Sequence, residues 1–182
     1  PWGYTRGLTL YAMEQVYRRT HNPRYLAYIE AWADSHVNTQ GEIDHPLNDL
    51  DDLQPGILIL ALYRDTGKER YKLAAEKIRK RFDAYPRTAD GGLWHGGVTE
   101  HTHQLWLDGM YMSMPFLVQY GEMFGDRKYA YREATNQLLL YAKHLNDPRT
   151  GLLFHAYDEL GTEPWAQPGT HHSSYFWGRS IG

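Results

Sequence analysis

Cysteine does not occur anywhere in the 182-residue sequence. Its absence excludes disulfides, thiolate zinc sites and cysteine nucleophiles. It does not distinguish a reducing cytosol from an export route that manages without cystines, so the compartment stays open on this ground.

Long apolar runs and an excess of one charge are missing as well. No apolar segment approaches the roughly 20 residues that a spanning helix needs, and the first residues lack a basic segment followed by an apolar one. The formal net charge is −3 and comes from interspersed charges without a long basic run. We therefore expect neither a membrane nor a nucleic-acid partner.

Three familiar nucleotide and nucleophile motifs are also absent: GxSxG, GxGxxG after a strand, and GxxxxGK[ST]. Nucleophile-elbow hydrolases, dinucleotide enzymes and P-loop NTPases therefore have no support, and we expect no cofactor. The histidines at 101, 103, 171 and 172 form no recognised ligand spacing, so no metal is expected either.

Aromatic residues and histidine are abundant, with 15 Tyr, 6 Trp and 10 His. Flat aromatic rings and hydrogen-bonding imidazoles are side chains that a sugar-binding cleft uses against C–H faces and hydroxyls. An aromatic helical core would explain the same composition, so composition alone does not decide between the two.

An internal repeat organises the chain. Segments 17–25 and 63–71 each begin and end with Tyr around a polar turn, and a third copy at 120–129 is one residue longer. Apolar runs of helical period flank each turn, which predicts three αα-hairpins. The expected helices cover 4–20, 23–38, 50–65, 68–84, 108–124 and 127–145, and a seventh is expected to begin near Ser173.

The links after the second and third hairpins repeat as well. Each carries Pro-Arg-Thr, glycine and an aromatic-His pair, ending at His95 in one and at His155 in the other. Segments 91–95 and 151–155 are predicted to be short and extended. Matched positions suggest that both histidines face one site, although a structural hydrogen-bonding role would also explain them.

Short turns within hairpins and longer patterned links between them predict an all-α fold, either an α/α barrel or a curved solenoid of helix pairs. A closed toroid needs about six hairpins, at roughly 50 to 60 residues each. We therefore expect residues 1–182 to form the N-terminal to central part of one α/α-barrel catalytic domain.

Two carboxylate positions begin corresponding helices and are predicted to point toward one end of the bundle. Asp108 is flanked by Trp106 and Met110, where burial would raise its pKa and the helix N-terminus would lower it. Asp51 and Asp52 begin the equivalent helix of the preceding repeat. Helix capping is the alternative explanation for Asp108, and a solvated turn for the Asp51–Asp52 pair.

The end of the chain carries a further candidate. Arg179 is a plausible fork for a carboxylate, and Trp177 beside it a stacking platform, as an acidic sugar would require. A surface ion pair is the alternative explanation for Arg179.

Together these segments resemble glycoside hydrolase family 105, the unsaturated rhamnogalacturonyl and glucuronyl hydrolases. The resemblance runs in order along the whole chain, and it is carried by WGYTRG at 2–7, LDDLQPG at 50–56, GLWH at 92–95, LWLDGMYM at 105–112, GLLFH at 151–155 and FWGR at 176–179. It implies an (α/α)6 toroid, here a partial barrel, and a bacterial cytoplasmic or periplasmic enzyme.

The resemblance also implies an activity and a site. Asp108 would be the catalytic acid and base, with Asp51, Asp52, His95, Trp106, His155, Trp177 and Arg179 around the sugar. Family members remove a 4,5-unsaturated uronic acid from the non-reducing end of lyase-generated oligosaccharides, as in pectin degradation, by hydrating its double bond.

Two other interpretations remain open. A related toroid hydrolase or sugar epimerase would act on saturated glycans, and a helical-repeat binding module would grip a glycan without needing any acid. Oligomeric state and the sugar next to the uronic acid have no readable pattern in the sequence.

Overall fold

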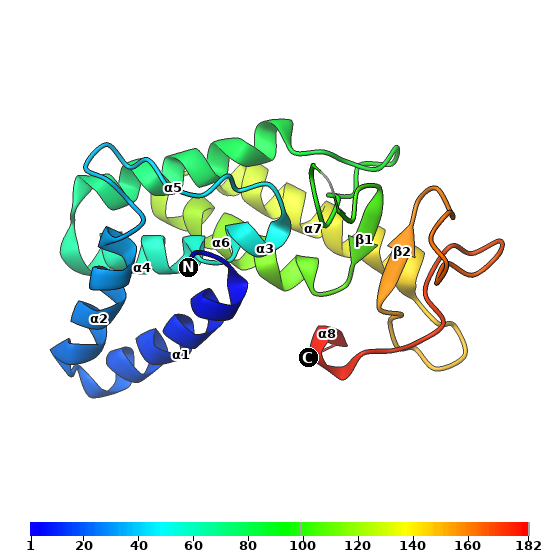
Figure 1. Ribbon diagram of the computed structural model, residues 1–182, viewed down its shortest axis with the longest axis horizontal. Helices are drawn as coiled ribbons and strands as arrows, with labels where there is room; N and C mark the ends of the chain where they lie inside the picture. The colour runs from blue at the N-terminus through cyan, green and yellow to red at the C-terminus, as the bar shows by residue number, and fades with distance from the viewer. Residues whose placement is uncertain (99, 182) are drawn as a thin grey trace.

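The computed structural model describes residues 1–98 and 100–181, apart from the side chain of Arg179. Six helices form three hairpins that follow one another along the chain (Figure 1). The pairs are α1 (Tyr4–Thr20) with α2 (Pro23–Asp34), α4 (Gly56–Thr66) with α5 (Glu69–Arg81), and α6 (Gly109–Phe124) with α7 (Arg127–Leu145). Three short helices accompany them: α3 (Leu50–Leu53), the 3-10 helix η1 (Phe82–Ala84) and α8 (Gly178–Ile181).

Each hairpin turn depends on one residue in the left-handed conformation. These residues are His21 with φ 52°, Gly67 with φ 66° and Gly125 with φ 80°. The backbone N–H of His21 donates to Tyr17 O, and that of Gly67 donates to Tyr63 O. The tyrosine that opens the repeat therefore accepts the terminal hydrogen bond in these two turns, as a helix C-cap requires.

The first helices of the hairpins pack against one another, with α4 between α1 and α6. Seven consecutive residues of α4, from Gly56 to Leu62, are buried. On α5, by contrast, burial is confined to Tyr71, Ala74, Ala75 and Ile78, the pattern of an outer helix. The α/α architecture predicted from the repeats is confirmed, and the helices form part of a toroid.

Two glycines let helices approach closely. A Cβ added to Gly56 would lie 2.7 Å from Phe116 Cδ2, and one added to Gly121 would lie 2.6 Å from Ala130 Cβ. Both distances are shorter than van der Waals contact, so glycine sets the spacing of α4 to α6 and of α6 to α7.

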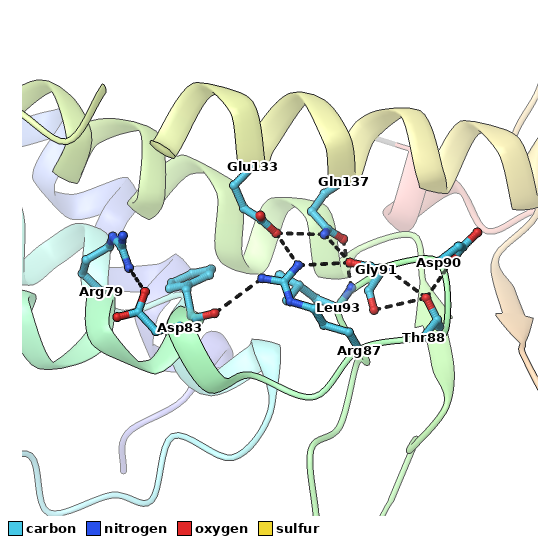
Figure 2. Close-up of polar contacts among 11 residues, drawn as sticks. Arg79, Asp83, Arg87, Thr88, Asp90, Gly91, Leu93, Glu133 and Gln137 are labelled. Atoms are coloured by element: carbon cyan, nitrogen blue, oxygen red, sulfur yellow. Dashed lines mark hydrogen bonds and ion pairs between the residues drawn. The ribbon is translucent and has the colours of Figure 1, made fainter. Parts of the chain in front are cut away.

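The link after the second hairpin is fastened to α7 by side chains (Figure 2). Arg87 Nη1 donates to Glu133 Oε1 at 2.6 Å and to Gly91 O at 3.0 Å. Gln137 accepts from Leu93 N and donates to Gly91 O, both at 2.9 Å. These bonds fix the link two residues before His95.

The two links are joined by a small sheet at one end of the helices (Figure 1). Strand β1 (Gln104–Trp106) pairs antiparallel with β2 (Ala156–Asp158), with Leu105 opposite Tyr157. The predicted extended segments 91–95 and 151–155 instead contribute one isolated bridge each, Arg87 to Leu93 and Asn146 to Leu153. The paired strands lie outside them.

Three predicted helix boundaries were wrong. The helix expected over 50–65 is divided into α3 and α4 at Pro55, which is the N-cap of α4 and has no backbone N–H to continue a helix. The helix expected to reach residue 38 ends at Asp34, and α8 begins at Gly178 instead of near Ser173. Within the described residues, no helix is long and apolar enough to cross a membrane.

Candidate active site

Asp108 occupies the N-cap position of α6, two residues after the end of the β1 strand. Its side chain makes no capping hydrogen bond, so the capping explanation for this residue finds no support. The atom Oδ1 is enclosed and has no hydrogen-bond partner among the described residues. A partly enclosed carboxyl that the fold leaves unused is available for proton transfer.

His95 lies close to Asp108 and is 6% exposed. Burial lowers the pKa of His95 to about 4, with His101 and His155 adding to the effect and the charge of Asp108 opposing it. The imidazole is therefore neutral at neutral pH. Its Nε2 atom faces Asp51 Oδ1 at 3.7 Å.

Trp106 stands between the two matched histidines. Its ring stacks on His95 with centroids 5.4 Å apart and meets the edge of His155 at 5.0 Å. His155 in turn meets Trp177 at 4.7 Å. The structure thus brings together four of the residues singled out from the sequence: one from each link, one from β1 and one directly before α8.

Hydrogen bonds hold this aromatic group in place. Trp106 Nε1 donates to Gln104 Oε1 at 2.8 Å, and Gln104 Nε2 donates to Glu163 Oε1 at 2.9 Å. His155 Nδ1 lies 2.8 Å from Ser180 Oγ, which ties α8 to the site. Arg179 was predicted to bind a carboxylate, but its side chain lies outside the described part of the chain, so this role stays a prediction.

The adjacent carboxylates Asp51 and Asp52 differ in their surroundings. Asp52 completes a capping box with Asp49 at the start of α3, and its Oδ1 lies 2.7 Å from His45 Nε2. Asp51 instead lines a cavity of about 460 Å³ together with His95. The structure therefore places Asp51 at the cavity and Asp52 in the support of the preceding loop.

A second cavity of about 470 Å³ lies between Trp106 and Trp165. The two indole rings are nearly perpendicular, with centroids 6.5 Å apart. Glu163 and Gln104 contribute polar atoms to its wall. His101 lines this cavity and the one beside Asp51, so the two adjoin.

A family model described as Glycosyl Hydrolase Family 88 matches residues 1–182. The chain belongs to this family. The chain is also similar to the unsaturated rhamnogalacturonyl hydrolase YesR of Bacillus subtilis (strain 168), with 26% identity over 185 residues that cover all of the chain and 50% of YesR.

Solved structures described as family 105 glycoside hydrolases are similar to the chain as well. A family 105 glycoside hydrolase from C. acetobutylicum ATCC 824 has 40% identity and a TM-score of 0.92, covering 98% of the chain and 50% of that protein. A Klebsiella pneumoniae protein described as a possible member of family GH105 has 26% identity and a TM-score of 0.77, covering 91% and 42%. The resemblance to family 105 is confirmed, and the chain spans about half the length of these relatives.

Several residues of this family 88 chain lie at the site without having been predicted from the sequence. Trp165 and Glu163 come from a loop that has no counterpart in the other links, so no repeat singled them out. Tyr141 lies on α7 within an apolar pattern and is indistinguishable from a core residue in the sequence. With Asp108 it lines a third, largely apolar cavity of about 830 Å³.

Among the described residues, no group of three or more His, Cys, Asp or Glu side chains is placed so that it could hold a metal ion. His101 and His103 both have left-handed backbone conformations, with φ 56° and 61°. His101 meets Trp106 edge-on with ring centroids 4.5 Å apart, and His103 lies 4.0 Å from Trp94 with the two rings tilted. His103 Nδ1 also lies 3.0 Å from Glu159 Oε2.

Proposed function

We propose that this protein is a glycoside hydrolase that removes a 4,5-unsaturated uronic acid, specifically an unsaturated galacturonyl unit, from lyase-generated oligosaccharides. The observation that carries the proposal is the enclosed, unpartnered carboxyl oxygen of Asp108 next to Trp106 and the neutral His95. The similarity to an unsaturated rhamnogalacturonyl hydrolase supports this choice of sugar.

Asp108 supplies both proton-transfer steps in this reaction. The protonated carboxyl donates its proton to C4 of the C4=C5 double bond, which places positive charge on C5 and the ring oxygen. Water then adds at C5 and gives its proton to the Asp108 carboxylate. The resulting hemiketal opens with loss of the aglycone, so one water is consumed and the acid is regenerated.

The surrounding residues would hold the substrate for this exchange. The indole of Trp106 offers a flat face to the sugar ring, and Asp51, His155 and Trp177 offer hydrogen bonds or stacking around it. Arg179 is proposed to bind the uronate carboxylate. Asp52 supports the site indirectly, since its Oδ2 accepts from the backbone N–H of Asn48 at 3.0 Å.

The two adjoining cavities fit an extended substrate. We place the unsaturated ring near Trp106 and the next sugar in the cavity toward Trp165, whose wall is aromatic on two sides and polar at Glu163. An oligosaccharide has this alternation of apolar C–H faces and hydroxyl edges.

The test measures the disappearance of the C4=C5 double bond of the substrate directly. The complete gene product is given an unsaturated uronyl disaccharide, and loss of the ultraviolet absorbance of the double bond is recorded. Asp108→Asn should abolish the loss while leaving the unfolding transition unchanged. Asp83→Asn is the matched control, because Asp83 is an exposed partner of Arg79 away from the site.

Two outcomes would contradict the proposal. Unchanged turnover by a folded Asp108→Asn protein would remove Asp108 from the mechanism. A folded wild-type protein that binds glycans but leaves the double bond intact would indicate a binding module or an enzyme for saturated glycans.

A further inference from the structure

Three buried polar atoms without described partners surround Gly109 at the start of α6. They are Oδ1 of Asp108, Nδ1 of His95 and the hydroxyl of Tyr141. They come from three separate parts of the fold: the N-cap of α6, the first patterned link and α7. Buried polar atoms are almost always hydrogen-bonded, so three orphaned atoms in one place indicate a functional arrangement.

The geometry at Gly109 shows how close these atoms lie. A Cβ added there would be 3.0 Å from the Tyr141 hydroxyl and 3.2 Å from His95 Nδ1. Both atoms therefore approach the same point beside the α6 backbone, one residue after Asp108. Glycine at this position allows the approach, because any side chain would occupy that point.

Tyr141 is suited to act as a lasting donor. The residue is 2% exposed, and burial, followed by the charge of Asp108, raises the pKa of its hydroxyl. The phenol thus keeps its proton at all pH values at which an enzyme works. Because the charge of Asp108 contributes to the raised pKa, the hydroxyl lies within electrostatic reach of that carboxyl. A neutral O–H that faces a carboxylate is a strong donor.

His95 is the weaker candidate for this role. A neutral imidazole carries a single N–H, and Nε2 of His95 faces the Asp51 carboxylate at 3.7 Å. This distance is too long for a hydrogen bond, but the nearby carboxylate favours the tautomer with the proton on Nε2, which leaves Nδ1 as an acceptor. Of the three orphaned atoms, the Tyr141 hydroxyl is then the donor.

We propose that Tyr141 is a positioning residue, whose hydroxyl donates a hydrogen bond to the enclosed oxygen of Asp108 and holds the carboxylate that remains after proton transfer to the substrate. The inference rests on the proposed role of Asp108. The two atoms are not hydrogen-bonded in the structure, and the inferred bond is one to the ionised carboxyl, which a titration without substrate detects. Tyr141 affects the reaction only through its effect on Asp108.

The experiment titrates Asp108 without substrate. The side-chain carboxyl carbon of Asp108 is followed by carbon-13 NMR in the complete protein, and its resonance is identified by its absence in Asp108→Asn. Tyr141→Phe should raise the measured pKa of Asp108 by about one to two units, because a hydrogen bond to the charged form is lost. An unchanged pKa in folded Tyr141→Phe would overturn the inference.

Tyr71→Phe is the matched control. Tyr71 is fully buried on α5, and its hydroxyl donates to Asp34 at the end of α2 at 2.5 Å. This variant should lose stability but leave the titration of Asp108 unchanged. The other titratable groups around the cavity and His95 are unchanged in every variant: Tyr4, Asp51, Tyr111, His95, His101 and His155.

A second substitution covers the case in which Tyr141→Phe does not fold. Tyr141→3-fluorotyrosine keeps the ring and makes the hydroxyl a stronger donor, so the pKa of Asp108 should fall. A rise or no change would overturn the inference.

Turnover provides the second readout. If the wild type hydrates the unsaturated disaccharide, the alkaline limb of its pH–rate profile should move upward in Tyr141→Phe by the same amount as the titration. A folded wild type that is inactive on this substrate would count against the proposed function and leave the result of the titration standing.

Discussion

Gln137→Leu is the substitution that best tests how the first link is held against α7. The Gln137 side chain is 1% exposed, and its amide accepts from Leu93 N and donates to Gly91 O and Glu133 Oε1 (Figure 2). Leucine has a similar volume, so the change removes the polar atoms and creates little cavity. The hydrogen bonds are what the experiment measures.

The magnitude depends on which groups lose all their partners. Arg87 continues to donate to Gly91 O and to Glu133 Oε1, so these two acceptors stay satisfied. The N–H of Leu93, a residue that is 1% exposed, loses its acceptor. Leaving one buried group unsatisfied, together with the other lost bonds, should reduce the free energy of unfolding by about 2 to 4 kcal/mol.

Equilibrium urea unfolding of the complete protein measures this loss. Asn136→Leu is the control, since it makes the same amide-to-leucine change one residue earlier on an exposed position of α7. Turnover should also fall in Gln137→Leu, because His95 follows Leu93 by two residues. A Gln137→Leu protein within about 0.5 kcal/mol of the control would refute the claim that this amide holds the link.

Three further expectations concern the site itself. Gly109→Ala places a Cβ 2.8 Å from Leu50 Cδ1 and 3.0 Å from the Tyr141 hydroxyl. The strain of about 1 to 3 kcal/mol should exceed the gain of about 1 kcal/mol in helix propensity, so a variant that melts above wild type would contradict the packing. Between pH 6.5 and about 4, stability should decline as the pH falls, because unfolded His95 binds a proton in this range and folded His95 does not. The decline amounts to at most about 3 kcal/mol, and urea unfolding of His95→Gln across the same range should show a flatter dependence. Trp165→Ala should raise KM for an unsaturated disaccharide several-fold and change kcat little, whereas an unchanged KM would move the second sugar elsewhere.

The hairpins were predictable because their signal is local. Each copy of the repeat contains its own turn residue, and two of the three are glycines in the left-handed conformation, Gly67 and Gly125. The division at Pro55 shows the limit of this reasoning. The apolar pattern continues through Pro55, and the absence of a backbone N–H there was the signal that should have ended the helix.

The candidate site was only partly predictable. Asp108 and Trp106 stand in one short motif, but the placement of Trp165 against Trp106 depends on contacts between segments far apart in the sequence. Asp51 and Asp52 are equivalent neighbours in the sequence. The spacing from Asp49 to Asp52 is that of a capping box, and this pattern could have separated the structural carboxylate from the one facing the cavity.

The pairing of β1 with β2 affects the order in which the protein acquires its structure. Each αα-hairpin closes through contacts between neighbours in the sequence, whereas Gln104 meets Asp158 only after the whole third hairpin between them has formed. Closing such a distant contact is entropically expensive and comes late in folding. A chain can therefore show full helical content while Trp106 still lacks its neighbours from the link after the third hairpin. Formation of the helices and assembly of the site are then separate steps of folding.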